Sequence, residues 1–230
     1  MESRQEKILK FIVDEYIRSA DPVGSKWLAE RRELDVSPAT IRNDMVALEK
    51  DGYLRQPHTS AGRVPTEAAY LYYLKHFVEA WQKGGDTQRL RTAVGVNESD
   101  ERALKALARV LVDLSGEMAI VAFDPRWSYY TGVSNLFSKP EFSDLSDMRT
   151  LSGLVDHFDE VMTQIFEQVP DEPQVMIGEE NPFGKDMAAI MVKCRLPSHQ
   201  IGILGLVGPV RMNYAKNLGL VRSAVEILDE

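Results

Sequence analysis

The 230-residue sequence predicts an α+β protein built from two domains. Helical apolar stripes followed by two short strand-like runs occupy the first third of the chain. The paired glycines Gly84 and Gly85 then interrupt the periodicity. Beyond them, helical stripes alternate with apolar runs of strand length, as expected of a sheet flanked by helices. We place the first domain at residues 1–83, a linker at 84–98 and the second domain at 99–230.

Composition narrows the classes of protein to which the chain can belong. With 44% hydrophobic residues it can bury real cores, and Cys194, as the only cysteine, excludes an internal disulfide. The N-terminus is charged and lacks the apolar core of a signal peptide. The longest apolar run, residues 201–210, contains glycines and a proline and is too short to span a bilayer. We therefore expect a cytoplasmic protein with no membrane segment.

The net charge of −8 is unevenly distributed. Residues 1–83 carry 13 Lys/Arg and 13 Asp/Glu, whereas residues 84–230 carry 14 and 22. The stretch from Gly52 to Thr66 contains Arg55, His58 and Arg63 and no acidic residue. Because salt screens each charge over roughly 10 Å, a local basic face can bind DNA although the whole chain is acidic.

The first domain reads as three helices. Residues 5–19 form an apolar stripe, Asp21–Gly24 ends it, and Ser25 can cap a second helix reaching about Glu33. After a turn at 34–36, a third helix begins at Ser37. Pro38 suits its first turn, and Gly52 suits its end.

The third helix has the features of a helix that reads DNA. Ile41, Met45 and Leu48 recur on one face, which leaves Thr40, Arg42, Asn43 and Ala47 facing outward. Arg and Asn match guanine and adenine edges in a major groove. A short capped helix preceded by another is the arrangement by which a helix-turn-helix reads DNA. The alternative is an ordinary solvated helix face.

Residues 53–65 are predicted to form a strand, a polar loop and a return strand. Together with the three helices, they indicate a winged helix-turn-helix. The loop contains no acidic residue, so its side chains can contact a DNA phosphate or enter a minor groove. The start of the second helix can also bind a phosphate through its backbone N–H groups. A surface hairpin and simple capping are the alternatives. The predicted DNA-binding residues are Ser25, Lys26, Ser37, Thr40, Arg42, Asn43, His58, Thr59, Ser60 and Arg63.

A helix over Glu67–Trp81 is rich in aromatic residues. We expect Tyr72, Tyr73, Phe77 and Trp81 to exceed what a small domain can bury, and hence to form a homodimer interface. The alternative is that these rings pack inside their own chain.

The second domain is expected to start at Ser99 with a helix. Strand-like runs follow at 118–123 and 131–136, then one long helix over Leu145–Val169. Three more strand-like runs at 174–178, 188–196 and 201–207 precede a last helix that begins at Asn213.

Several long blocks resemble the HrcA family of heat-inducible transcription repressors, in matching order. They are Pro22–Lys26, Val36–Met45, Gln56–Thr66, Ser134–Phe142, Ile177–Asn181 and Gly208–Ala215. The resemblance implies a winged helix followed by a GAF-like domain, and a bacterial repressor that binds an inverted repeat ahead of chaperone operons. It also implies dependence on the chaperonin, which keeps such repressors folded until heat-damaged clients compete for it.

One departure concerns a dimerising domain that family members usually carry as an insert. Here residues 123–131 bridge that place directly, so the insert is missing. We still expect a homodimer, because a two-fold protein matches an inverted repeat.

Other functions find less support in the residues. The four histidines are scattered and form no spaced ligand set with Cys194, and no nucleophile accompanies Glu179 and Glu180. We expect no enzyme, no metal and no cofactor. A regulator that senses a small molecule through its GAF-like domain remains the alternative function.

Overall fold

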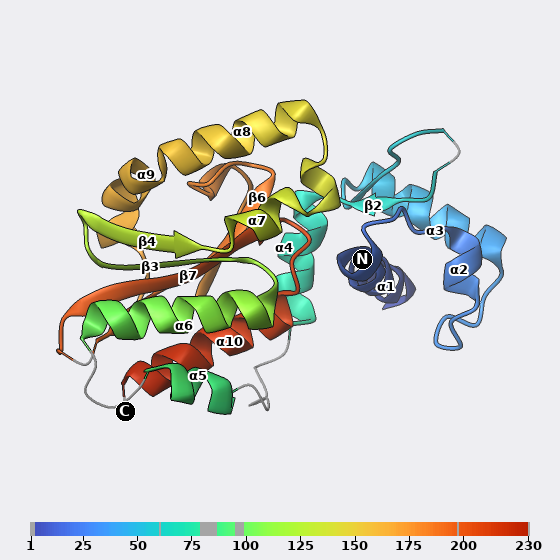
Figure 1. The fold of residues 1–230 in the computed structure, drawn as a ribbon. Coiled ribbons are helices and arrows are strands. Elements are labelled where there is room, and N and C mark those ends of the chain that lie inside the picture. The colour runs from blue at the N-terminus through green and yellow to red at the C-terminus, as the bar shows by residue number, and fades with distance from the viewer. Residues whose placement is uncertain (1–2, 60, 79–86, 95–98, 197, 230) are drawn as a thin grey trace. The chain divides into compact units, whose positions relative to one another are not determined.

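The computed structural model describes residues 3–59, 61–78, 87–94, 99–196 and 198–229. The chain divides into two compact units, residues 1–79 and 80–230, each with its own core. The helices and strands of both units are drawn in Figure 1. The mixture of helices and sheet confirms the predicted α+β class.

The N-terminal unit is a helical cluster with a small hairpin. Its elements are α1 (Ser3–Ser19), α2 (Ser25–Ala29), α3 (Pro38–Lys50), β1 (Leu54–Arg55), β2 (Val64–Pro65) and α4 (Glu67–His76). Ile8, Leu9, Ile12 and Val13 of α1 are fully buried, as the helical spacing predicts. They pack against the buried stripe of α3, and α3 in turn contacts α2, where Leu28 is fully buried.

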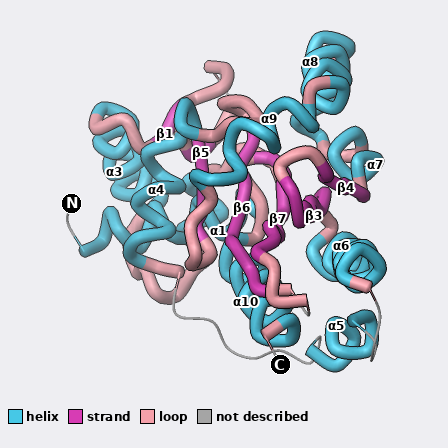
Figure 2. The backbone as a smooth tube through the Cα atoms, turned by 90° about the vertical axis from the view of Figure 1, so that its left-hand side faces the viewer, coloured by secondary structure: helices cyan, strands magenta, loops and turns pink. Residues whose placement is uncertain are grey.

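The C-terminal unit contains one five-stranded antiparallel sheet in the order β4-β3-β7-β6-β5. Figure 2 shows these strands in that order, viewed from the side. The strands are β3 (Met118–Asp124), β4 (Trp127–Thr131), β5 (Gln174–Ile177), β6 (Met187–Arg195) and β7 (Ile201–Pro209). Its helices are α5 (Thr87–Val94), α6 (Asp100–Ser115), α7 (Val133–Phe137), α8 (Leu145–Asp156), α9 (Phe158–Ile165) and α10 (Tyr214–Leu228). Short 3-10 turns lie at Pro140–Phe142, Phe166–Gln168 and Gly178–Glu180.

Helices cover both faces of this sheet. In Figure 1, α8 and α9 lie on one side and α5, α6 and α10 on the other. Met118, Ile120 and Ala122 of β3 join the core under α7, α8 and α9, while Ala119 and Val121 alternate with them and are also fully buried. A sheet buried on both faces reads as a continuous apolar run, which is why its central strands were visible in the sequence.

Within the expected linker, residues 84–98, the structure shows a helix, α5, at residues 87–94. Leu90 is fully buried and anchors this helix against α6 and α10. A single buried leucine in a polar octapeptide gives little periodicity, so the sequence alone does not show the helix.

Three predictions of helices and strands are also wrong, two in the second unit and one at the end of the first. The strand expected at 131–136 ends at Thr131, because Gly132 takes a left-handed φ of +85° and opens α7. The single helix expected over 145–169 divides at His157 into α8 and α9, and this break turns Phe158 and Met162 into the core. The aromatic helix of the first unit ends at His76, five residues earlier than predicted.

The shorter second helix is a further difference. α2 ends at Ala29, four residues before the expected end, and Leu34 is buried in the turn that follows. Asp35 in that turn has a φ of +40°, a conformation no helix contains.

Candidate nucleic-acid interface

Helix α3 has the ends that its sequence predicts. The Ser37 hydroxyl accepts the Thr40 backbone N–H at 3.2 Å, and Pro38 occupies the first helical position, where it loses no hydrogen bond. Beyond the last helical residue, Gly52 adopts a φ of +82°, which favours glycine. Local sequence signals therefore predict the length and position of this helix.

The outward face of α3 is polar at its N-terminal half. Ile41, Met45 and Leu48 are buried, whereas Arg42 and Asn43 are exposed. Thr40 and Ala47 are half-buried, so they contribute less to this face than predicted. The Thr40 hydroxyl also lies 2.9 Å from the Ser37 hydroxyl, which occupies it within the cap.

The inner face of α3 is tied to α1 by a two-bond ion pair. Arg4 donates from Nε to Asp44 Oδ2 at 2.7 Å and from Nη2 to Asp44 Oδ1 at 3.1 Å. Asp44 is buried, and a bidentate arginine fixes both the distance and the orientation of the carboxylate. This contact holds α3 in one rotation about its own axis, with Arg42 and Asn43 outward.

The wing predicted at residues 53–65 is confirmed as an antiparallel hairpin in which Leu54 pairs with Pro65 and Arg55 with Val64. Its loop is ordered from within by Gln56, whose side-chain amide donates to the Thr59 carbonyl at 3.0 Å and to the Ala61 carbonyl at 3.1 Å. Ser60 lies outside the described residues. These two bonds hold Thr59 and Ala61, on either side of Ser60, to Gln56.

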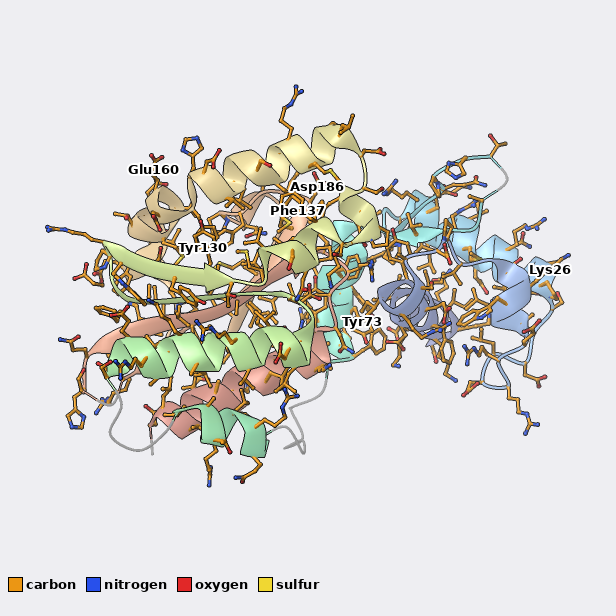
Figure 3. All side chains as sticks on the ribbon, in the orientation of Figure 1. Lys26, Tyr73, Tyr130, Phe137, Glu160 and Asp186 are labelled. Atoms are coloured by element: carbon orange, nitrogen blue, oxygen red, sulfur yellow. The ribbon has the colours of Figure 1, made fainter. Side chains whose placement is uncertain are left out.

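The start of α2, the outer face of α3 and the wing enclose a groove of about 470 Å³, which we call the interface groove. Lys26, labelled in Figure 3, lies in α2. The lining residues are Gly24, Ser25, Lys26, Arg42, Met45, Val46, Gln56, Thr59, Ala61, Gly62 and Arg63. Lys26 and Arg42 are exposed, and within the described part of the chain neither makes an ion pair. The groove can therefore offer both cations to an anionic ligand.

The structure brings together five of the predicted DNA-binding residues at this groove: Ser25, Lys26, Arg42, Thr59 and Arg63. Two of them have other partners or little exposure. Ser25 is only 8% exposed, and the cap of α2 is Gly24 rather than Ser25. Arg63 pairs with Glu49. Asn43 and His58 are exposed but do not line the groove.

Val46 and Gln56 are among the groove residues that the sequence did not predict. Val46 is 36% exposed and lies one helical turn after Arg42, so it adds an apolar patch to the polar face. Its spacing of four from Arg42 was the available signal. Gln56 was taken for part of a strand, and nothing local indicated that its amide organises the loop.

The aromatic side chains of α4 are largely used inside the N-terminal unit. Tyr73 is 9% exposed and donates to Asp14 Oδ1 at 2.5 Å, and burial raises the pKa of its phenol. Tyr72 donates to Glu6 at 2.8 Å and stacks on His76 with ring centroids 4.1 Å apart. Phe77 is half-buried, and Trp81 lies outside the described residues. For Tyr73, packing within its own chain is the better description.

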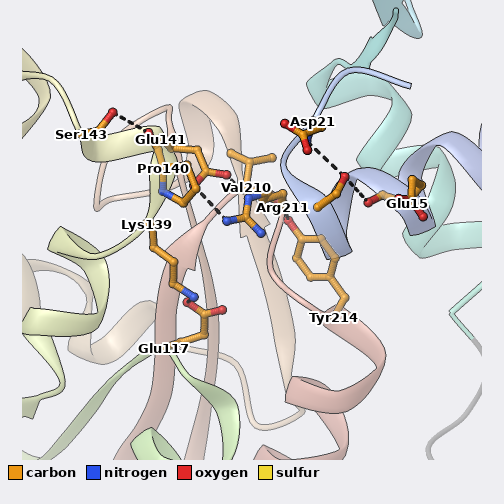
Figure 4. A network of polar contacts seen from close by, with 11 residues as sticks. Glu15, Asp21, Glu117, Lys139, Pro140, Glu141, Ser143, Val210, Arg211 and Tyr214 are labelled. Carbon is orange, nitrogen blue, oxygen red and sulfur yellow. Dashed lines mark hydrogen bonds and ion pairs between the residues drawn. The ribbon is translucent and has the colours of Figure 1, made fainter. Parts of the chain in front are cut away.

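Two of the blocks that carry the family resemblance meet in a polar network of the C-terminal unit (Figure 4). Lys139 lies 2.9 Å from Oε2 of the buried Glu117, and Arg211 pairs with Glu141. Burial raises the pKa of Glu117, and the Lys139 ammonium opposes that rise. The network joins the start of β3, the segment after α7 and the end of β7, so it holds elements that are far apart in the sequence.

Metal and membrane features add nothing to this interface. Among the described residues, no three histidine, cysteine or acidic side chains gather in a way that would hold a metal ion. No described helix is both long enough and apolar enough to cross a bilayer.

A capped helix set on its predecessor, a hairpin wing beside it and a cationic groove between them define the winged helix-turn-helix class of DNA-binding proteins. Residues 4–66 match the family described as DeoR-like helix-turn-helix domain, and residues 56–218 match the HrcA protein C terminal domain. The second match covers more than half of the sequence, and the chain belongs to the HrcA family.

Named relatives agree with this assignment. The Heat-inducible transcription repressor HrcA of Halalkalibacterium halodurans is 26% identical over 322 residues, covering 95% of this chain and 94% of the relative. The protein of the same name from Bifidobacterium adolescentis is 44% identical over 126 residues, covering 53% of this chain and 32% of the relative. A solved structure titled "Crystal structure of a hypothetical protein at 2.2 A resolution" superposes with a TM-score of 0.77 at 20% identity, over 99% of this chain and 96% of that one. This last likeness concerns the fold alone.

The alignment with the Halalkalibacterium protein also bears on the missing insert. It is 322 residues long, whereas this chain has 230, so the relative carries residues that have no counterpart here. In this chain β3 and β4 pair directly across the turn at Asp124–Trp127, in the segment where the insert was expected.

Proposed function

We propose that this protein is a sequence-specific repressor that binds an inverted-repeat operator ahead of chaperone operons and releases it on heat shock. The observation that carries the proposal is that Arg42 and Asn43 are both exposed on a helix held in place by Arg4 and Asp44, and that Arg42 lines the interface groove together with Lys26. Membership of a family whose members are named heat-inducible transcription repressors supports the biological role.

The residues around the groove divide by chemistry. Arg42 and Asn43 carry the paired donors and acceptors that base edges require. Lys26 is a point charge on a flexible stem, which suits a phosphate and carries no sequence information. Thr59 and His58 lie on the wing, where they suit the DNA backbone. Ser37 contributes through the helix cap, which fixes where Arg42 begins its approach.

Footprinting on the host's chaperone promoters tests the core of the proposal. We expect protection of two half-sites related by a dyad, and no protection of a control fragment in which the half-sites are scrambled. Protection should be lost as the temperature is raised through the heat-shock range. Equal protection of the scrambled fragment would contradict sequence-specific repression.

We propose that the chaperonin sets the amount of active repressor, as the family resemblance implies. The test adds purified chaperonin and ATP to a gel-shift assay after mild heating of the repressor. Recovery of operator binding is expected with chaperonin and not with an equal mass of serum albumin. If the heated protein recovers equally in both, chaperonin dependence is wrong for this chain.

We also propose a homodimer, despite the missing insert. A monomer presents one α3 and gains nothing from a second half-site, whereas two tethered helices gain from a high effective concentration. Tyr73 is buried and bonded within its own unit, and Tyr72 bonds to Glu6, so of the predicted residues Tyr72, Tyr73, Phe77 and Trp81 we keep Phe77 in the interface, while Trp81 lies outside the described residues. We add Leu71 to the interface, because it is 49% exposed. Sedimentation at micromolar concentration, with and without operator, checks this, and a monomer in both conditions would contradict it.

The alternative, a winged-helix regulator that senses a small molecule through its second domain, is not favoured. The relatives from Halalkalibacterium and Bifidobacterium are named heat-inducible transcription repressors, and no ligand-specific motif is visible in the sequence. We therefore assign the response to temperature.

A further inference from the structure

Three contacts made by Gly62 and Arg63 join the wing to the helix-turn-helix, and Arg63 takes part in two of them. We infer that Arg63 is a positioning residue: through Glu49 it fixes the wing at the distance from α3 that DNA recognition requires, and it does not bind phosphate itself. This inference rests on the proposed DNA-binding function and corrects the sequence-based assignment of Arg63 as a DNA contact.

The first contact is a backbone bridge between the wing and the turn before α2. The Val23 N–H donates to the Arg63 carbonyl at 2.9 Å, and the Arg63 N–H donates to the Val23 carbonyl at 2.9 Å. The exchange of both hydrogen bonds makes Arg63 part of a two-residue ladder. These two hydrogen bonds therefore fix the Arg63 backbone independently of its side chain.

The second contact is the close approach at Gly62. A Cβ added there would lie 2.3 Å from the Val23 oxygen and 2.4 Å from the Val23 carbonyl carbon. These are backbone atoms, which cannot move aside cheaply. Any other residue at 62 would push the wing away from the turn before α2, so the geometry of the bridge depends on this glycine.

The third contact is the ion pair with Glu49 in the last turns of α3. Arg63 Nε and Nη2 each lie 3.0 Å from Glu49 Oε2, and the Arg63 side chain is only 13% exposed. A guanidinium held by two nitrogens on one oxygen has little freedom to reach a phosphate. The side chain therefore joins the wing to α3.

Removing the negative charge of Glu49 distinguishes the two possible roles of Arg63. Glu49 lies on the helix that faces DNA, and its side chain is 33% exposed. Removing its negative charge should strengthen DNA binding if Arg63 is a phosphate contact and Glu49 only a bystander. If Glu49 is the anchor of the wing, the same change should weaken binding, because the wing loses its attachment. The two roles predict opposite signs.

The experiment measures operator affinity and its salt dependence for Glu49→Gln, Arg63→Gln, the double variant and Gly62→Ala, all in the full chain. We expect each single variant to bind about ten-fold more weakly and the double variant to be no weaker than either single, because contacting residues are non-additive. The salt slope should stay at its wild-type value. Gly62→Ala should reproduce the loss, since it displaces the wing without changing any charge. Lys26→Gln is the matched control, and its slope should fall by about one unit.

Several results would overturn the inference. One is unchanged or tighter binding by Glu49→Gln. Another is a slope lowered by about one unit in Arg63→Gln, with losses that add in the double variant. Full affinity in Gly62→Ala would have the same consequence. If Arg63→Gln does not fold, Glu49→Gln and Gly62→Ala still give the answer.

Amide hydrogen exchange separates this inference from the proposed function, because it needs no DNA. In Glu49→Gln, the amides of Val23 and Arg63 should exchange at least ten-fold faster, while those of Met45 and Leu48 inside α3 keep their wild-type rates. Unchanged exchange at Val23 and Arg63 would overturn the positioning role even if the operator is bound. Failure of the wild-type chain to bind any operator would instead refute the proposed function and leave the exchange result standing.

Discussion

Replacing Arg42 and Lys26 in turn should separate base reading from phosphate binding within one groove. Arg42→Ala removes the exposed guanidinium on α3 without disturbing the helix, because its neighbours Ile41 and Met45 carry the packing. A base-edge contact is worth about 1–3 kcal/mol, so we expect binding to the specific site to weaken about 5- to 140-fold. Binding to random DNA should change far less.

Lys26→Ala should behave differently. Losing one phosphate contact lowers the salt slope by about 0.9. Between 50 and 200 mM salt, a four-fold range, the advantage of the wild type over Lys26→Ala should therefore shrink by about 3.5-fold, on specific and random DNA alike. Fluorescence anisotropy over this salt range measures the affinity of each variant for the specific site and for random DNA, and the salt slope of each.

Lys7→Ala is the matched control, because Lys7 is an exposed cation of α1 that does not line the interface groove. It should leave specificity unchanged and shift the slope less than Lys26→Ala. The reasoning is refuted if Arg42→Ala weakens specific and random binding by the same factor. It is equally refuted if Lys26→Ala changes specificity and leaves the slope intact.

Three further changes have outcomes that follow from single contacts. Ser37→Ala removes the cap of α3 and should lower the free energy of unfolding by about 1 kcal/mol in urea titrations, whereas Ser37→Asp should retain it; equal stability of all three proteins would contradict the cap. Burial raises the pKa of the Cys194 thiol to about 12, so at pH 8 the thiol stays protonated and enclosed, and a thiol reagent should label it only in denaturant; rapid stoichiometric labelling of the native protein would contradict this. Val46 should contact a thymine methyl, so an operator with uracil in place of thymine should bind the wild type about four-fold more weakly and bind Val46→Ala about as well as the thymine form. An identical loss for both proteins would remove Val46 from base reading.

Many of the successes of sequence reading rest on local signals. The cap at Ser37, the proline after it and Gly52 beyond the helix act within a few residues, so they locate α3 without any knowledge of the fold. The cap at Asn213 likewise marks the start of α10. Apolar runs predicted the central strands because both faces of the sheet are covered.

The predictions that were wrong depend on contacts between residues that are far apart in the sequence. Residues 145–169 carry one continuous helical pattern, and the break at His157 arises because the chain must turn Phe158 into a core built by β3, β6 and β7. α5 exists because α6 and α10 bury Leu90. The role of Arg63 depends on Glu49, fourteen residues away, and on Val23, forty residues away.

The class of fold, the position of α3, the presence of a wing and the family could all be predicted from the amino-acid sequence. Periodicity, capping and ordered motifs encode these features locally, and they survive any change in how the elements pack. Which side chains face the groove, and which are already bonded to partners within the chain, depends on how the elements pack. Whether an arginine is available to DNA depends on what lies within about 3 Å of its guanidinium, and for Arg63 that neighbour, Glu49, is brought there by folding.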